Sequence, residues 1–124
     1  MMELSFSEEC LILVLRNFDF LRHEGYLIDG IVVYGREPFI LFKSKAYSRE
    51  ILIQWACHSE INVSFYNTAF LVFRNKKITI EQLASYFGFT FSNTLNIEHS
   101  VYEKAKFCKM QLLEVVKGKM WLNI

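Results

Sequence analysis

Residues 50–66 read EILIQWACHSEINVSFY, and an alternation runs through this stretch. Apolar side chains occupy every second position on both sides of the polar segment 58–60. These apolar residues are Ile51, Ile53, Trp55, Cys57, Ile61, Val63 and Phe65. Because successive side chains of a strand point to opposite faces, the pattern predicts an antiparallel hairpin with one buried face. The opposite face, which includes Gln54, Asn62 and Tyr66, is mixed and polar.

A helix is predicted before this stretch. Ser5 and Glu8 match a capping box, and Ser7 is an alternative cap for the same helix. Apolar residues then recur at spacings of three and four, which is typical of a helix with one buried stripe. Gly25 is expected to end the helix, because glycine adopts the left-handed conformation that often follows a helix C-terminus.

Three further strands are predicted on either side of the central hairpin. β-branched residues at 26–34 indicate a strand that is interrupted at Asp29-Gly30, and a turn leads from it into a strand at 39–43. The continuous apolar run 69–73 predicts a fifth strand. The polar and basic residues at 74–77 then indicate a turn exposed to solvent.

Two helices are predicted after the strands. Thr79 and Gln82 match a second capping box, and Gly88 is expected to end this short helix. A long amphipathic helix follows, because apolar residues recur at helical spacing through 101–115. Gly118 is expected to close it.

The order of these elements predicts an α+β fold. It consists of an N-terminal helix, a central antiparallel sheet of about five strands and two C-terminal helices packed on one face of the sheet. With a length of 124 residues, the chain 1–124 is expected to form a single domain. The predicted core contains Leu11, Val14, Phe18, Ile53, Trp55, Val63, Leu83, Val101, Cys108 and Leu112.

The composition indicates a partner and a location. The chain is 52% hydrophobic and 16% aromatic, a surplus which indicates that some apolar surface meets a partner. Cys10, Cys57 and Cys108 have no close spacing and are interpreted as reduced core thiols. The first apolar run, 10–15, is much shorter than the roughly 20 residues of a membrane span. We therefore expect neither a signal peptide nor a membrane anchor, and a cytoplasmic protein.

Charge is distributed unevenly along the chain, although the formal net charge is only +1. Residues 1–30 carry a local net charge of −4, whereas residues 31–77 carry +4. The two regions could attract partners of opposite charge, or each other. The alternative is that both are ordinary solvated surfaces of a near-neutral domain.

No pattern of residues indicates catalysis. Cys57 and His58 are neighbours, but adjacent side chains on a strand point to opposite faces, so this imidazole cannot serve the thiol as a base. His23 and His99 are interpreted as solvated polar residues, and the sequence contains neither a credible carboxylate pair nor a glycine-rich phosphate loop. We therefore expect no catalytic residue, no cofactor and no metal site, and we do not expect an enzyme.

Binding of single-stranded RNA is an alternative function. Phe39, Tyr47 and Trp55 are interleaved with Lys43 and Lys45, as on sheet surfaces where bases stack. Most of the aromatic residues in this region nevertheless follow the apolar alternation and are expected in the core. Nucleic acid is therefore not the expected partner. An adaptor module and a small enzyme without a recognisable motif are further alternatives.

The motif FDFLRHEGY at 18–26 is followed by Tyr47-Ser48, which leads into the alternating segments ILIQW and EINVS. In these motifs, residues 11–66 resemble small bacterial immunity proteins. Such proteins are encoded beside polymorphic toxins or contact-dependent growth inhibition toxins, and they are compact α+β inhibitors. The resemblance implies a non-enzymatic inhibitor that neutralises a cognate toxin by occluding its active site or its substrate path.

Two surfaces are predicted to bind the partner. Asp19, Glu24 and Asp29 belong to the acidic N-terminal region, whose charge would steer a basic toxin surface. Asn62 and Tyr66 lie on the polar face of the sheet, where an exposed tyrosine suits the centre of an interface. The acidic surface is the preferred one of the two.

Overall fold

The structure, a computed structural model, describes residues 3–56, 60–69, 76–92 and 96–122. Within these residues, five strands form one antiparallel sheet in which sequence neighbours are also spatial neighbours. The strands are β1 (Leu27–Val32), β2 (Phe39–Ser44), β3 (Arg49–Gln54), β4 (Asn62–Asn67) and β5 (Lys76–Thr79). In such a meander each strand pairs with the next one along the chain, so no long crossover connection is needed.

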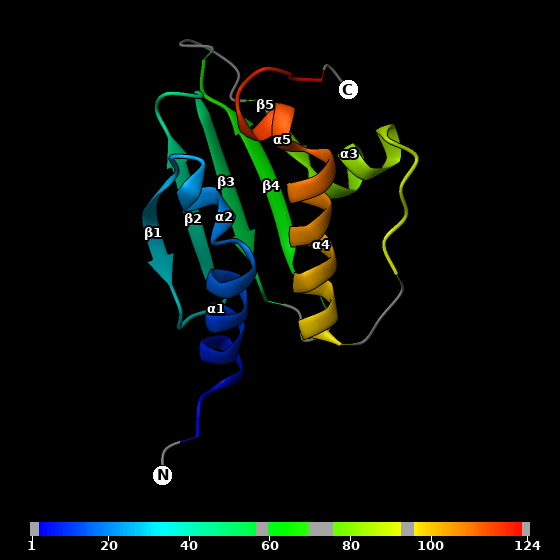
Figure 1. The fold of residues 1–124 in the computed structure, drawn as a ribbon. Coiled ribbons are helices and arrows are strands. Elements are labelled where there is room, and N and C mark those ends of the chain that lie inside the picture. The colour runs from blue at the N-terminus through cyan, green and yellow to red at the C-terminus, as the bar shows by residue number, and fades with distance from the viewer. Residues whose placement is uncertain (1–2, 57–59, 70–75, 93–95, 123–124) are drawn as a thin grey trace.

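Helices that come before and after the strands lie together on one side of the sheet (Figure 1). The helices are α1 (Phe6–Asn17), α2 (Phe20–His23), α3 (Ile80–Tyr86), α4 (Ile97–Gln111) and α5 (Leu113–Val116). α1 packs against α4, and α3 contacts β4 and β5. The predicted α+β fold, with an N-terminal helix, an antiparallel sheet and C-terminal helices packed on it, is confirmed.

The core lies between the helices and the covered face of the sheet. Ile51 lies opposite Phe65 and Ile53 opposite Val63, and all four side chains are buried. The predicted core residues are all buried except Leu11, which is half-buried against the core. The alternation in 50–66 therefore holds where the structure describes it, and the segment 57–59 lies outside the described residues.

Polar contacts define the beginnings of α1 and α3. Ser5 and Glu8 form the predicted capping box of α1, and the box predicted at Thr79 begins α3. Ser7, the alternative cap, instead accepts a hydrogen bond from Trp55 Nε1 at 2.8 Å. This contact joins α1 to the core, because Trp55 is almost completely buried.

Two predicted helices are divided in the structure. α1 ends at Asn17 and the short α2 follows, whereas the sequence predicted one helix up to Gly25. Phe18 and Leu21, which flank the start of α2, are both buried, so the break keeps two large side chains in the core. The C-terminal helix divides at Leu112, where φ is −111° and ψ is 13°.

The fifth strand also differs from its prediction. The strand predicted at 69–73 lies almost entirely outside the described residues. The strand that pairs with β4 is β5, and its first half falls in the solvent turn predicted at 74–77. That turn is wrong at Lys76 and Lys77, and its first two residues lie outside the described residues. At a sheet edge, Lys77 stays exposed while Ile78, opposite Phe65, is buried. A lysine pair is therefore compatible with an edge strand as well as with a turn.

Two side chains of α4 hold this helix against the start of β4. Ser100 Oγ accepts a hydrogen bond from the Ile61 amide at 3.2 Å, and Lys104 Nζ donates to the Ile61 carbonyl at 2.6 Å. Lys104 Nζ also lies 3.7 Å from a carboxylate oxygen of Glu60 and 3.3 Å from one of Glu81. Because residues four apart share one helix face, Ser100 and Lys104 together satisfy both backbone groups of Ile61. These contacts set the position of α4 on the sheet.

Candidate functional site

One face of the sheet carries no described helix, and the strand register identifies its residues. Residues directly opposite each other on neighbouring strands share a face. The open sheet face is formed in β2, β3 and β4 by Phe39, Leu41, Lys43, Glu50, Leu52, Gln54, Asn62, Ser64 and Tyr66. These residues alternate with core residues such as Ile40 and Ile51. The open sheet face is therefore the outer surface of the central strands.

A shallow depression of about 400 Å³ lies on the open sheet face. It is lined by Glu37, Phe39, Leu41, Glu50, Leu52, Gln54 and Tyr66. Leu41 and Leu52 lie opposite each other in neighbouring strands, and both are half-buried. Polar side chains surround this apolar pair, and two of them, Glu37 and Glu50, carry negative charge. An apolar centre with a polar rim is the usual composition of a protein-binding surface.

Two of the residues predicted to bind a partner lie on this face. Tyr66 is half-buried and lies between Glu50 and Lys77 in the register of the three neighbouring strands. Asn62 is exposed opposite Gln54. The structure thus places Tyr66 in the wall of the depression and Asn62 at the first position of β4.

The sequence did not predict the apolar centre of the open sheet face. Phe39 was predicted to start a strand and to belong to an aromatic and basic surface, and Leu52 falls on the face of the 50–66 hairpin that was described as mixed and polar. Phe39 and Phe42 are three residues apart, and residues three apart on a strand point to opposite faces. This spacing could have shown that only one of the two belongs to the core. Phe42 is indeed in the core, whereas Phe39 lines the depression. Ser64, on the same face, is buried.

The three predicted acidic residues lie around α2 and in β1. Asp19 precedes α2, and its carboxylate lies 3.8 Å from an Arg22 nitrogen and 3.2 Å from His23 Nε2. Glu24 follows α2 and forms an ion pair with Lys117 at 3.8 Å. Local partners therefore offset the charge of both carboxylates.

Asp29 lies apart from these two ion-paired carboxylates. It is exposed in β1, at the register shift between Ile28 and Gly30, where the sequence predicted an interruption. Within the described parts of the chain, Asp29 takes part in no ion pair. A β-bulge of this kind displaces the backbone of an edge strand and so discourages further strand pairing. Asp29 at the bulge has this structural role whether or not it contacts a partner.

The two thiols that the structure describes, Cys10 and Cys108, are unreactive near neutral pH. Burial raises the pKa of Cys10 to about 11, and burial also raises the pKa of Cys108 well above its ordinary value. Both are free thiols in the core, so neither is a reactive thiolate near neutral pH. Cys57 and His58 lie outside the described residues. His23 contacts Asp19, and His99 is exposed on α4.

The described residues contain neither a cluster of metal ligands nor a helix that could span a membrane. Among residues 3–56, 60–69, 76–92 and 96–122, no group of three or more His, Cys, Asp or Glu side chains is arranged to hold a metal ion. None of the helices in these ranges combines the length and apolar character needed to cross a membrane. The described surface does contain a sheet face with an apolar centre.

No protein-family model matches the chain, and neither a curated protein nor a solved structure is significantly similar to it.

Proposed function

We propose that this chain is a non-enzymatic inhibitor that binds another protein through its open sheet face. The observation that carries the proposal is the depression in which Leu41 and Leu52 lie side by side, with Phe39 and Tyr66 beside them. An apolar cluster left at the surface of a sheet is stabilised when a partner removes it from water. Binding requires no catalytic group, only a rigid and complementary surface.

The proposed partner is a bacterial toxin. This choice rests on the resemblance of residues 11–66 to immunity proteins of polymorphic-toxin and contact-dependent growth inhibition systems. In this proposal the protein acts in the cytoplasm and occludes the active site or the substrate path of the toxin. Glu37 and Glu50 at the depression would complement a basic toxin surface.

The same carboxylates argue against RNA in the depression, whose lining contains neither Lys43 nor Lys77 of the same face. Phe39 and Tyr66 could stack on bases, but Glu37 and Glu50 line the same depression and would repel phosphate groups. A protein segment with apolar and basic side chains satisfies both features of the depression. For this reason a protein partner is preferred to a nucleic acid.

Tyr66 and the Leu41–Leu52 pair are the proposed anchors of the interface. Tyrosine is enriched among the residues that dominate binding energies, because it combines a large apolar ring with a hydroxyl group. Tyr66 lines the depression and is paired in the strand register with Glu50 on one side and Lys77 on the other. The acidic residues Asp19, Glu24 and Asp29 stay predictions as partner contacts.

The experiment begins with the toxin gene nearest to the gene of this chain. Co-expression of the chain should restore growth of cells that express this toxin, and the two proteins should co-purify in equal amounts. Tyr66→Ala and Leu52→Gln should each weaken the complex about tenfold or more, which corresponds to about 1.4 kcal/mol or more. The matched control is Ile12→Gln, because Ile12 is an exposed apolar residue on α1, on the other side of the sheet.

Two outcomes would contradict the proposal. Failure of the chain to bind or neutralise any neighbouring toxin would remove the toxin as the partner. Equal affinities for wild type, Tyr66→Ala and Leu52→Gln would remove the open sheet face as the binding surface. Since the variants replace half-buried surface side chains, unfolding curves can verify that they remain folded.

A further inference from the structure

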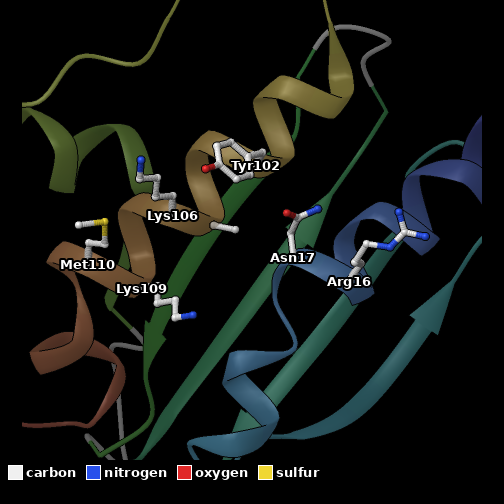
Figure 2. A pocket seen from close by; sticks show the side chains of 7 residues that line it. Arg16, Asn17, Tyr102, Lys106, Lys109 and Met110 are labelled. Carbon is white, nitrogen blue, oxygen red and sulfur yellow. The ribbon is translucent and has the colours of Figure 1, made fainter.

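A second surface lies on the opposite side of the sheet, in the groove between α1 and α4. The α1–α4 groove has a volume of about 510 Å³. Arg16 comes from α1, and Tyr102, Ala105, Lys106, Lys109 and Met110 come from α4 (Figure 2). α1 and α4 pack directly against each other and together cover the sheet (Figure 1). The groove is therefore distinct from the open sheet face.

The charge of the α1–α4 groove is entirely positive. Arg16, Lys106 and Lys109 line it, and no carboxylate does. Within the described residues, none of these three cations forms an ion pair. Lys104, on the same helix, shows the contrast, because it is buried and paired with Glu60 and Glu81. Lys106 Nζ lies 5.9 Å from the centre of the Tyr102 ring, a contact that leaves its positive charge without a carboxylate. Lys104 holds α4 on the sheet, whereas the charges of the groove can attract an anionic group.

Apolar side chains line the groove beside these cations and Asn17. Ala105 is buried beneath it, while Tyr102 is 53% exposed and Met110 is 66% exposed. Met110 also lines an adjoining depression of about 370 Å³ that includes Phe89, which is 39% exposed. The one carboxylate lining that depression, Glu103, accepts hydrogen bonds from the Ser92 amide and hydroxyl at 2.9 and 2.8 Å. Exposed methionine and aromatic side chains on helices adapt readily to an apolar partner surface. The groove thus combines apolar contact area with unpaired positive charge.

We propose that the α1–α4 groove binds an acidic amphipathic helix of a partner protein. The apolar side of such a helix would contact Tyr102 and Met110, and its carboxylates would meet Lys106, Lys109 and Arg16. Binding of an amphipathic helix in an apolar groove is a common mode of recognition, and charge complementarity sets its partner preference. From Tyr102 to Met110 the rise along α4 is about 12 Å, which matches about two turns of a bound helix.

Nucleic acid fits the groove less well. Three cations provide few phosphate contacts, and the whole chain has a formal net charge of only +1. Met110 and Phe89 offer apolar surface that a phosphate backbone would leave without a partner. Charge and apolar surface together therefore favour an acidic protein helix. RNA binding is nonetheless one of the outcomes that the experiment distinguishes.

The test uses synthetic probes and the full chain. The first probe is a fluorescent helical peptide of about 15 residues with Leu on one side and Glu on the other. The second is a peptide of the same composition in scrambled order, and the third is a single-stranded RNA oligonucleotide. Fluorescence anisotropy is measured for wild type, K106E/K109E and the control K45E/K119E, which changes net charge equally at two exposed lysines.

Wild type should bind the amphipathic peptide more tightly than the scrambled one, and binding should weaken as salt is raised. K106E/K109E should weaken it about tenfold or more, whereas K45E/K119E should change it by less than about twofold. Met110→Gln should weaken it several-fold without a change in charge. Equal binding by the two charge variants, equal binding of the two peptides or tighter binding of the RNA would overturn the proposal. K106Q/K109Q provides the same comparison without new negative charge.

Discussion

Replacement of Arg49 by methionine should destabilise the protein strongly. Arg49 is only 4% exposed, and its guanidinium group has no carboxylate partner among the described residues. It donates instead to backbone carbonyls, at 3.1 Å to Val115, 3.1 Å to Ser48 and 3.1 Å to Met120. The guanidinium carbon lies 4.9 Å from the centre of the Trp121 ring. Arg49 thereby attaches the C-terminal segment to β3.

The magnitude follows from the groups that lose their partners. Methionine fills a similar volume but donates no hydrogen bond, so the carbonyls of Val115, Ser48 and Met120 lose their charged donor. The Val115 and Ser48 carbonyls still accept from the backbone amides of Gly118 and Thr68, so each of them loses only its bond to the cation. A hydrogen bond to a charged group contributes about 1.5–3 kcal/mol, and an acceptor left unsatisfied when buried costs about 1–3 kcal/mol, a cost that falls here on the Met120 carbonyl. Methionine also avoids the free-energy cost of removing a cation from water, which offsets part of this loss. The same desolvation lowers the pKa of Arg49. The expected net loss is about 3 kcal/mol.

Urea unfolding followed by circular dichroism measures this loss directly. The matched control is Lys45→Met, which makes the same kind of change at an exposed lysine in the turn after β2 and should alter stability by less than about 0.5 kcal/mol. A loss smaller than about 1 kcal/mol for Arg49→Met would refute the reasoning, because it would mean that the carbonyls find other donors at little cost.

Three further predictions concern stability. Lys104→Met should cost about 2 kcal/mol or more in urea unfolding, because Lys104 donates to a buried carbonyl and pairs with two carboxylates; a stability equal to wild type would contradict this. Gly118→Ala should lower the thermal midpoint clearly, because φ is +72° and a Cβ would lie 2.6 Å from the Tyr47 carbonyl oxygen; an unchanged midpoint would show that the turn rearranges freely. Burial raises the pKa of Cys10 to about 11, so its contribution to stability is complete below the ordinary thiol pKa of 9.0 and is lost as pH rises towards 11. Wild type should therefore lose more free energy of unfolding than Cys10→Ala between these pH values. If the stability of both proteins changed equally with pH, the raised pKa of Cys10 would be contradicted.

Much of the sheet and core could be predicted because the burial pattern has a clear period. Alternation in 50–66 identified Ile53, Trp55 and Val63 as core residues, and all three are buried. The capping box at Ser5 marked the start of α1 correctly, because it is a local interaction that the sequence contains completely. Local signals and strong periodicity thus carried the prediction of architecture.

The missed features depend on contacts between distant segments. Lys77 suggests a solvent turn locally, but pairing with β4 makes it part of an edge strand. The break before α2 and the division at Leu112 satisfy burial requirements of the assembled core, which helical spacing does not report. Tertiary packing overrode local propensity at each of these places.

The candidate surfaces were only partly predictable for the same reason. Tyr66 was identified from its type and its face, but the apolar pair Leu41 and Leu52 forms only when β2 and β3 take their register. The α1–α4 groove is lined both by Arg16, from the N-terminal part of the chain, and by Lys106, from the C-terminal part. Neither grouping leaves a contiguous signal in the sequence.

Methyl NMR of the complex tests the central claim most directly, namely that the open sheet face binds the partner protein. The chain carries labelled Leu and Ile methyl groups and is titrated with the unlabelled partner that co-purifies with it. The account predicts large shift changes or broadening at Leu41 and Leu52, and little change at Ile12 on the other side of the sheet. Unchanged Leu41 and Leu52 signals, together with changes at Ile12, would contradict it.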